Sequence, residues 1–203
     1  MESSTNIAYE LSKRTFFNRL SGFVKRKFLE TIASSKKIDR TVRISKSSKV
    51  QTVAGGSISI GKFSVVHDYA MILSYGGKIQ IGDFCTVNPF CILYGHGGLR
   101  IGNGVRIAAS TIIIPANHGF NDISKFIFQQ DETRQGIVIE DDVWIGAGTK
   151  ILDGVHIGQG SVIGAGSVVT KNIENFTVVA GNPARIIRRR GAKTPPTPGG
   201  HLA

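Results

Sequence analysis

Histidine is the side chain best suited to move a proton at neutral pH, and four histidines lie in the middle of this chain. They are His67, His96, His118 and His156. An imidazole with an ordinary pKa near 6.5 can take a proton from a hydroxyl, and such general base catalysis typically contributes about 10²–10⁴-fold. By position, His118 is the candidate, because it begins the longest irregular stretch, where a side chain can overhang a cleft.

The other histidines have simpler interpretations. His156 ends a regular segment just before Ile157, which predicts an outward, solvent-facing side chain. His67 follows Val66 on a predicted face, and a structural or surface role is expected. Asn88 follows Val87 where a small outward residue is usual, so it is either a corner residue or a hydrogen-bonding group in a cleft.

Small residues and positive charge follow one another near the C-terminal end of the chain. Ala147 and Ala165 are eighteen positions apart, and larger side chains there would close a groove between neighbouring turns. Arg185 and Arg188 come after the last small-residue segment. Arginine binds phosphate through charge-assisted, bidentate hydrogen bonds, although a solvated basic tail is the alternative.

The elements that position these residues are set by a repeat of six. The residues that define its phase are Ile139, Ile145, Ile151, Ile157, Ile163 and Val169. Six fits neither an amphipathic helix nor a simple hairpin, and it indicates a coil of short strands and corners, with three hexads in each turn. Cys85 and Cys91 lie in phase with this repeat, so we expect both thiols in the core and no covalent intermediate on either.

The repeat is interrupted once by a long insertion. Ile113 and Ile139 are 26 residues apart, which leaves room for the segment NHGFNDISKFIFQQDETRQG. We therefore expect one protruding loop at residues 118–137. The predicted fold is all-β, a parallel β-helix over residues 41–190.

At this point the chain resembles the left-handed β-helix hexapeptide-repeat acyltransferases. It is most similar to the maltose and galactoside O-acetyltransferases and to the sugar O-acetyltransferases of surface-polysaccharide synthesis. The hexads, NHGF, IEDDVWIGAG, VIGAGSVVTK and GNPAR carry the resemblance over about residues 55–190. It implies a left-handed coil, a homotrimer with active sites between subunits, acetyl-CoA as the donor, and direct transfer without a metal.

The resemblance also implies roles for individual residues. His118 would be the catalytic base, and Asn88 would line the cleft and contact both donor and acceptor. Ser74 matches an acceptor-contact position, and His96 stands where the galactoside and maltose branch has Asp, which makes it a candidate acceptor-recognition residue. The donor-binding positions would be Trp144, Ala147, Ala165, Thr170, Lys171, Arg185 and Arg188, with the last two on the 3′-phosphate of the adenosine.

The two ends differ from the repeat. Residues 1–50 hold 12 Lys/Arg against 4 Asp/Glu, so most of the net charge of +11 belongs to the N-terminal arm. Residues 1–40 are predicted to be a basic arm containing an amphipathic α-helix over 9–32, which packs on the coil or contacts an anionic membrane surface. Residues 191–203 are rich in Pro and Gly and are expected to be disordered.

Composition excludes several classes of protein. No apolar run approaches the roughly 18 residues of a membrane span, and the N-terminus has no secretory signal, so a cytoplasmic location is expected. No recognised motif supports nucleic-acid binding. A zinc hydratase is disfavoured because His67, His96 and His118 include no close pair.

The function expected from the sequence is acetyl transfer from acetyl-CoA to a sugar hydroxyl, on a surface-polysaccharide precursor. Three alternatives stay open: N-acetylation of an amino sugar, acetylation of a xenobiotic such as chloramphenicol, and a coil that serves as an inactive scaffold.

Overall fold

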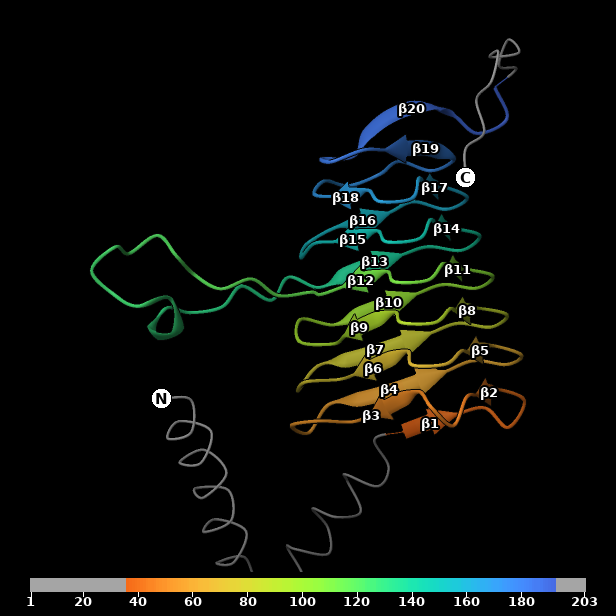
Figure 1. Cartoon of the computed structure of the whole chain (residues 1–203), viewed down its shortest axis with the longest axis horizontal. Helices are drawn as coiled ribbons and strands as arrows, with labels where there is room; N and C mark the ends of the chain where they lie inside the picture. Colours follow the sequence, from red (N-terminus) through yellow and green to blue (C-terminus); the bar gives the residue numbers. More distant parts are fainter. Residues whose placement is uncertain (1–35, 193–203) are drawn as a thin grey trace, which may run out of the picture. The chain divides into compact units, whose positions relative to one another are not determined.

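The computed structural model describes residues 36–192, and these coil into a parallel β-solenoid (Figure 1). Successive strands join three sheets in turn. Sheet A has the order β1-β4-β7-β10-β13-β16, sheet B the order β2-β5-β8-β11-β14-β17-β19-β20, and sheet C the order β18-β15-β12-β9-β6-β3. The final pair, β19 and β20, is antiparallel.

The strands are short, as a six-residue repeat requires. Sheet A consists of β1 (Lys36–Ile38), β4 (Ser57–Ile60), β7 (Lys78–Ile81), β10 (Leu99–Ile101), β13 (Ile137–Ile139) and β16 (His156–Ile157). Sheet B consists of β2 (Arg43–Ile44), β5 (Val65–Val66), β8 (Thr86–Val87), β11 (Arg106–Ile107), β14 (Trp144–Ile145), β17 (Val162–Ile163), β19 (Thr177–Ala180) and β20 (Arg185–Arg189). Sheet C consists of β3 (Lys49–Gln51), β6 (Met71–Leu73), β9 (Ile92–Tyr94), β12 (Ile112–Ile113), β15 (Lys150–Ile151) and β18 (Val168–Val169).

The phase of the hexads places one aliphatic side chain per strand inside the coil. Ile145 and Ile163 are paired in register on sheet B, and Ile151 and Val169 on sheet C. All four are at most 1% exposed. Because each turn covers the next, stacking buries these side chains and at the same time pairs the backbone groups of neighbouring strands in hydrogen bonds. The predicted core and its six-residue period are confirmed.

We name the three edges of the coil by the sheets that they join: the A/B, B/C and C/A corners. Corners need positive φ, which glycine adopts without steric cost. Gly148 and Gly166 both have φ of 69° at the B/C corner. In the N-terminal turns, aromatic residues take such positions instead. Tyr69 and Phe90 both have positive φ, lie at the B/C corner, and stack with ring centroids 5.2 Å apart.

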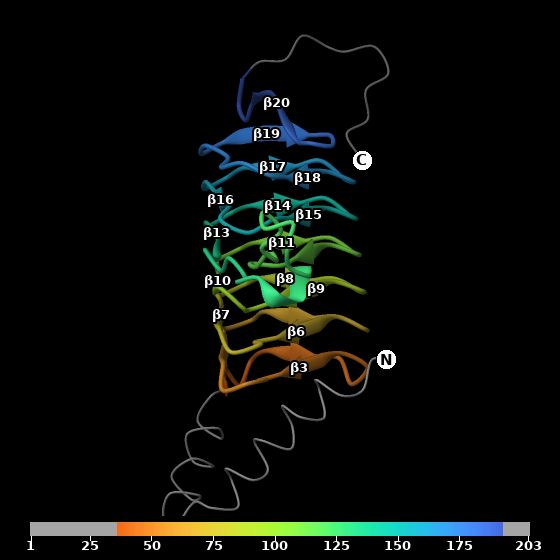
Figure 2. The ribbon, with the colours of Figure 1, turned by 90° about the vertical axis from the view of Figure 1, so that its left-hand side faces the viewer.

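A single loop leaves the coil among the described residues, between β12 and β13 at the C/A corner (Figures 1 and 2). Its stem is held by an antiparallel bridge between Asn117 and Thr133, and a short 3₁₀ helix, η1 (Ile127–Gln129), lies farther out. The predicted loop is confirmed, although Ile137 is 1% exposed and opens β13.

The predicted helix at residues 9–32 and the tail at 193–203 lie outside the described residues. The first strand, β1, pairs with β4, so stacking begins at Lys36, inside the segment that sequence analysis assigned to the N-terminal arm. Within residues 36–192 the structure contains no helix long and apolar enough to cross a membrane.

Candidate functional site

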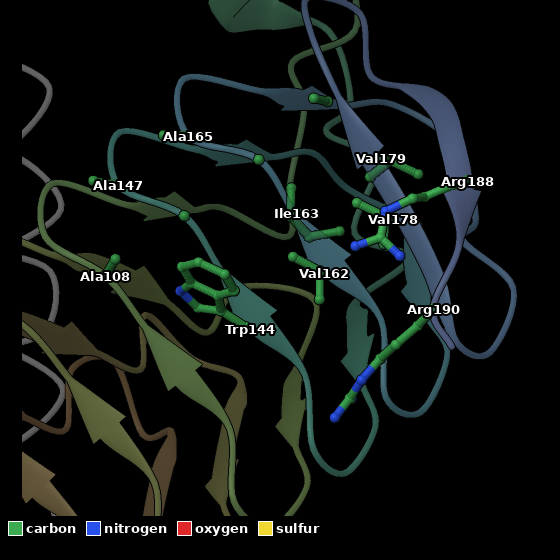
Figure 3. Close-up of a pocket in the computed structure, with 13 residues that line it drawn as sticks. Ala108, Trp144, Ala147, Val162, Ile163, Ala165, Val178, Val179, Arg188 and Arg190 are labelled. Carbon is green, nitrogen blue, oxygen red and sulfur yellow. The ribbon is translucent and has the colours of Figure 1, made fainter. Parts of the chain in front are cut away.

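A groove of about 470 Å³ runs along the C-terminal turns of sheet B toward the B/C corner (Figure 3). Its floor is made of small residues stacked one per turn: Ala108, Gly146, Gly164 and Ala180. Backbone hydrogen bonds connect these turns, such as Gly146 N to Ile163 O at 2.8 Å and Gly164 N to Val179 O at 2.7 Å. The floor is therefore main chain with almost no side chain above it.

The small residues are required by the geometry of the turns. A Cβ on Gly146 would lie 2.5 Å from the backbone nitrogen of Ala165, and one on Gly164 would lie 2.7 Å from the Cβ of Ala180. Ala147 and Ala165 are exposed at the B/C corner and line the groove, as predicted. Together they leave a shallow channel wide enough for a thin ligand.

Trp144 forms one wall of this groove (Figure 3). It lies on the outer face of β14, in register with Val162 on β17, and its side chain is 46% exposed. The indole therefore lies outside the core of the coil. An exposed indole beside an apolar channel offers a flat contact surface to a ligand.

Positive charge closes the C-terminal end of the groove. Arg188 lies on β20 opposite Val178, and the bulge between Val178 and Val179 shifts the register of this strand pair. Its guanidinium makes one hydrogen bond in the structure, from Nη1 to Arg189 O at 3.3 Å. Arg188 therefore brings a nearly free cation to the groove, as the sequence predicted.

A second arginine of the groove, Arg190, was missed. Its Nη1 lies 2.7 Å from Asp142 Oδ2 and 2.9 Å from Gly160 O, so its position is anchored from two sides. The run RIIRRR signalled charge, but the contacts with Asp142 and Gly160 that hold Arg190 at the groove come from distant parts of the chain. Arg185 is exposed outside the groove lining and donates to its neighbour Ala184 O at 3.0 Å.

Three other predicted donor-site residues lie outside the lining of this groove. Thr170 and Lys171 are exposed at the C/A corner, directly after β18. Asn88 lies at the B/C corner one turn below Ala108, and its Nδ2 donates to Ile107 O at 2.8 Å. A primary amide has two N–H donors and an acceptor oxygen, so Asn88 keeps one donor and its Oδ1 for a ligand.

His118 stands at the root of the loop, at the C/A corner. The loop stem holds it: Asn117 exchanges backbone hydrogen bonds with Thr133 at 3.0 and 2.9 Å, and Gly119 N donates to Asp131 O at 3.1 Å. The imidazole is 64% exposed. The fold thus presents His118 outward on a two-stranded support.

Glu132, on the returning strand of that stem, faces His118. Its Oε1 lies 3.6 Å from His118 Nδ1, and its Oε2 accepts hydrogen bonds from Arg134 Nε at 3.0 Å and Nη2 at 2.8 Å. These hydrogen bonds from Arg134 hold the pKa of the Glu132 carboxyl below its usual value. A carboxylate next to a histidine can orient the imidazole as a base. Sequence analysis missed Glu132 because the stem pairing brings it there from fourteen residues away.

His96 belongs to the same corner. Its ring stacks on Tyr75 at 4.8 Å and meets Tyr94 edge-on at 5.6 Å. Burial lowers the pKa of the His96 imidazole, the charge of Arg134 acts in the same direction, and Glu132 opposes both. His96 Nδ1 is buried without a hydrogen-bond partner among the described residues. The structure therefore brings His96, His118 and Glu132 into one cluster.

Ser74 does not join that cluster. It is fully buried, and its hydroxyl accepts from Val53 N at 2.8 Å and donates to Val53 O at 3.1 Å. The sequence assigned it to acceptor contact, but no part of its side chain reaches the surface. Its role in this structure is to hold neighbouring turns together.

The remaining histidines and both cysteines have structural surroundings. His156 is exposed on β16 with Nε2 2.8 Å from Glu140 Oε1, as expected for an outward residue. His67 lies at the B/C corner, whereas His96 and His118 lie at the C/A corner, and residues 36–192 contain no cluster of side chains suited to a metal ion. Cys85 and Cys91 are buried, and burial raises the pKa of both thiols.

Comparison with known proteins identifies a family that shares the six-residue repeat. Residues 136–171 match the family described as bacterial transferase hexapeptide (six repeats). This segment contains β13 to β18 and two of the four floor residues of the groove, Gly146 and Gly164. Residues 136–171 are therefore a segment of hexapeptide repeats. The predicted resemblance to hexapeptide-repeat acetyltransferases is confirmed.

Three relatives show how far the similarity extends. An acetyltransferase of Schizosaccharomyces pombe is 42% identical over 93 residues, which are 45% of this chain and 43% of that protein. A 2,3,4,5-tetrahydropyridine-2,6-dicarboxylate N-acetyltransferase of Clostridium perfringens is 56% identical over 57 residues, 28% of this chain and 24% of that one. Both alignments thus span less than half of the relative's own length.

The third relative is a solved structure that the hexapeptide-repeat coil matches over most of both chains. It is a point mutant of AntD, an N-acyltransferase from Bacillus cereus, in complex with dTDP-4-amino-4,6-dideoxyglucose and coenzyme A. The TM-score is 0.68 at 26% identity, with 81% of this chain and 89% of AntD covered.

Proposed function

We propose that this protein is an acetyltransferase that moves an acetyl group from acetyl-CoA to a sugar. The observation that carries the proposal is the groove on sheet B: a main-chain floor, an exposed indole at one side, and the cation of Arg188 at one end. Curated relatives that share the repeat are acetyltransferases, and AntD was solved with coenzyme A. The left-handed sense of the coil is part of this proposal.

The groove suits the donor for physical reasons. The pantetheine arm is long and thin, so a channel with no side chains above its floor admits it. Ala147 and Ala165 form the rim of this channel, and Trp144 gives it a flat wall. Arg188 lies where the 3′-phosphate of the adenosine would receive a charge-assisted hydrogen bond. Thr170 and Lys171, outside the groove of their own chain, are proposed to contact the donor held by a neighbouring subunit.

On the acceptor side, His118 removes the proton from the attacking group. Glu132 keeps the imidazole oriented from the opposite strand of the loop stem, and Arg134 keeps Glu132 in place. The acceptor oxygen or nitrogen attacks the thioester carbonyl as it loses its proton, the carbon–sulfur bond breaks, and the thiolate of coenzyme A leaves. The free N–H of Asn88 is placed to donate to the carbonyl oxygen as negative charge develops on it.

Within one chain, the donor groove and the His118 cluster lie at different corners of the coil, and this separation supports an assembly of several chains. The donor groove lies on sheet B and at the B/C corner, whereas His118, Glu132 and His96 lie at the C/A corner. We propose a homotrimer in which His118 of one subunit faces the groove of the next. A closed cyclic arrangement repeats the same head-to-tail contact and so completes three sites at once.

A mixing experiment tests this assembly. His118→Ala removes the base, and Ala165→Trp blocks the groove, so each variant alone is expected to be inactive. When the two are unfolded and refolded together, mixed trimers contain sites with an intact groove from one chain and an intact His118 from the other. Recovered activity supports shared sites. A mixture that stays as inactive as the two separate variants would place both parts in one chain.

The acceptor group is a hydroxyl in our primary proposal, on a precursor of a surface polysaccharide. An amino sugar is the second candidate, because AntD and the Clostridium perfringens relative are N-acyl and N-acetyl transferases. The same base could serve both, since an ammonium group must also lose a proton before it attacks. A screen of sugars and amino sugars with acetyl-CoA, read by mass of the product, separates the two.

The function itself is tested first at the donor groove. Acetyl-CoA is titrated calorimetrically into the wild-type protein, into Ala165→Trp, and into Phe63→Trp as a control at the exposed A/B corner, outside the groove. We expect micromolar binding to the wild type and the control, and at least a tenfold loss in Ala165→Trp. A folded protein that does not bind acetyl-CoA would contradict the proposal and favour an inactive scaffold.

A further inference from the structure

A second groove, of about 370 Å³, lies on the outer face of sheet A. Its side chains come from two places. Lys78, Gln80 and Arg100 project from β7 and β10, where Gln80 and Arg100 are paired in register. Gln135 comes from the end of the loop, just before β13. Neither the donor groove nor the His118 cluster uses these four side chains.

The cations of this groove have no partner. Among residues 36–192, neither Lys78 nor Arg100 makes a side-chain hydrogen bond or ion pair, and the amides of Gln80 and Gln135 are also free. Other cations on the same coil are engaged: Arg189 with Glu174, and Arg190 with Asp142 at 2.7 Å. Two unpaired cations and two free amides, each of which can donate, therefore surround one hollow.

Two carboxylates beside the lining of this groove, those of Asp153 and Glu140, are already occupied. Asp153 accepts hydrogen bonds from Gln135 N at 3.1 Å and from Gly136 N at 2.9 Å. Glu140 Oε1 lies 2.8 Å from His156 Nε2, and its Oε2 accepts from Gln159 N at 2.9 Å. These hydrogen bonds, first that of His156, lower the pKa of Glu140, and Arg100 acts in the same direction from farther away. Of the described residues that line the groove, none carries a carboxylate. The groove is therefore suited to an anion with several oxygens, such as a phosphate or diphosphate.

The groove adjoins the acceptor corner through shared backbone. Gly97 and Gln135 line it, and they directly follow His96 and Arg134 in the chain. Gly97 N donates to Pro115 O at 3.0 Å, close to the start of the loop stem. A Cβ on Gly97 would lie 2.7 Å from the backbone carbon of Arg134, so this strip of main chain is tightly packed. The donor groove opens on a different sheet, away from this one.

We propose that the groove on sheet A binds the phosphate or diphosphate of the acceptor, which makes the acceptor a sugar phosphate ester rather than a free sugar. In its assignment to an acceptor, this inference rests on the function proposed above. Lys78 and Arg100 hold the anionic oxygens, and Gln80 and Gln135 donate to those that remain. The sugar then extends past Gly97 toward His118, while the donor approaches from sheet B of the neighbouring subunit.

The test uses inorganic pyrophosphate as the probe, titrated calorimetrically into the full chain with saturating coenzyme A, so that the donor groove is filled. Lys78→Ala/Arg100→Ala is compared with Arg40→Ala/Lys62→Ala, which removes the same two residue types from turns outside the groove. We expect saturable binding that weakens at least tenfold in the first double variant and less than twofold in the second. UDP is titrated in parallel: tighter binding than pyrophosphate indicates a nucleotide carrier, and equal binding indicates another diphosphate ester.

Two results would overturn the inference: no saturable binding of pyrophosphate to the wild type, or equal losses in the two double variants. Failure here is separable from failure of the proposed function. Lys78→Ala/Arg100→Ala is expected to bind acetyl-CoA as the wild type does, and His118→Ala is expected to bind pyrophosphate as the wild type does. If acetyl-CoA binding is intact and pyrophosphate binding is absent, the groove on sheet A is rejected and the acetyltransferase stands.

Discussion

Arg188 allows a quantitative test of the donor site, because the proposed contact can be removed from either side. The guanidinium is removed by mutation of the protein, and the 3′-phosphate is removed by a change of ligand. Among the described residues Arg188 makes one long hydrogen bond, from its guanidinium to the uncharged carbonyl oxygen of Arg189 at 3.3 Å, so little of its donor capacity is used by the fold. A hydrogen bond between charged groups contributes about 1.5–3 kcal/mol. At about 1.4 kcal/mol per tenfold change in Kd, Arg188→Ala should weaken coenzyme A binding by roughly 10- to 150-fold.

The assay is a calorimetric titration of coenzyme A and of 3′-dephospho-coenzyme A into the wild type and Arg188→Ala. If Arg188 holds the 3′-phosphate, the wild type binds the dephospho ligand about as weakly as the variant binds coenzyme A. The variant should then bind both ligands equally. Because β20 is held to β19 through its backbone, the variant is expected to keep its fold.

Arg185→Ala is the matched control. Arg185 lies on the same strand, but its guanidinium donates to Ala184 O and lies outside the groove lining. We expect its effect on coenzyme A binding to stay within about twofold, as for surface charges without a close partner. Equal losses for coenzyme A and its dephospho form in Arg188→Ala, or a larger loss in Arg185→Ala, would refute the assignment of the phosphate to Arg188.

The other predictions concern the base, its orientation, the core and acid stability. His118→Ala should lower kcat by at least about 100-fold, in line with loss of a general base, with coenzyme A binding within about twofold by calorimetry. Glu132→Gln should lower kcat by roughly tenfold without changing the KM for acetyl-CoA, with partial recovery in Glu132→Asp; an unchanged kcat would remove Glu132 from the site. Ile145→Ala should cost about 2–5 kcal/mol in denaturant unfolding, because Ile145 is fully buried and stacked on Ile163. The pKa of Glu132 is lowered in the fold by hydrogen bonds from Arg134, so its contribution to stability is complete above the unfolded value and declines as pH falls below about 4.5; Glu132→Gln should reduce that acid-side loss in Tm between pH 6 and pH 4.

The coil was predictable because its signal is local and repeated. Each hexad buries one aliphatic residue. This pattern occurs six times in succession from Ile139 to Val169, so one exception would not have obscured the six-residue period. The predicted protruding loop follows from the one long interval in that series. Ala147 and Ala165 line the groove that their eighteen-residue spacing predicted, whereas Trp144 and Arg188, which also line it, were assigned to the donor by the resemblance.

Residues whose roles depend on contacts across the fold were not predictable in the same way. Glu132 reaches His118 through strand pairing inside the loop, where no hexad sets the register. Arg190 lines the groove because Asp142 and Gly160, which are distant in the chain, hold its guanidinium there. The resemblance placed Ser74 at an acceptor-contact position, whereas in the fold its buried hydroxyl bonds to the backbone of Val53.

The sequence by itself determined the period of the coil, its buried face and the edge that carries small residues, since these depend only on which side of a short strand each residue takes. The tertiary structure decided which charges are free and which are paired. In the sequence, Lys78 and Arg100 do not differ from the other basic residues of the chain. Only the pairing of β7 with β10 beside the loop root shows that both line one groove without a carboxylate partner. Pairing of charges depends on distances of a few ångströms between residues far apart in the chain, and the order of residue types does not contain those distances.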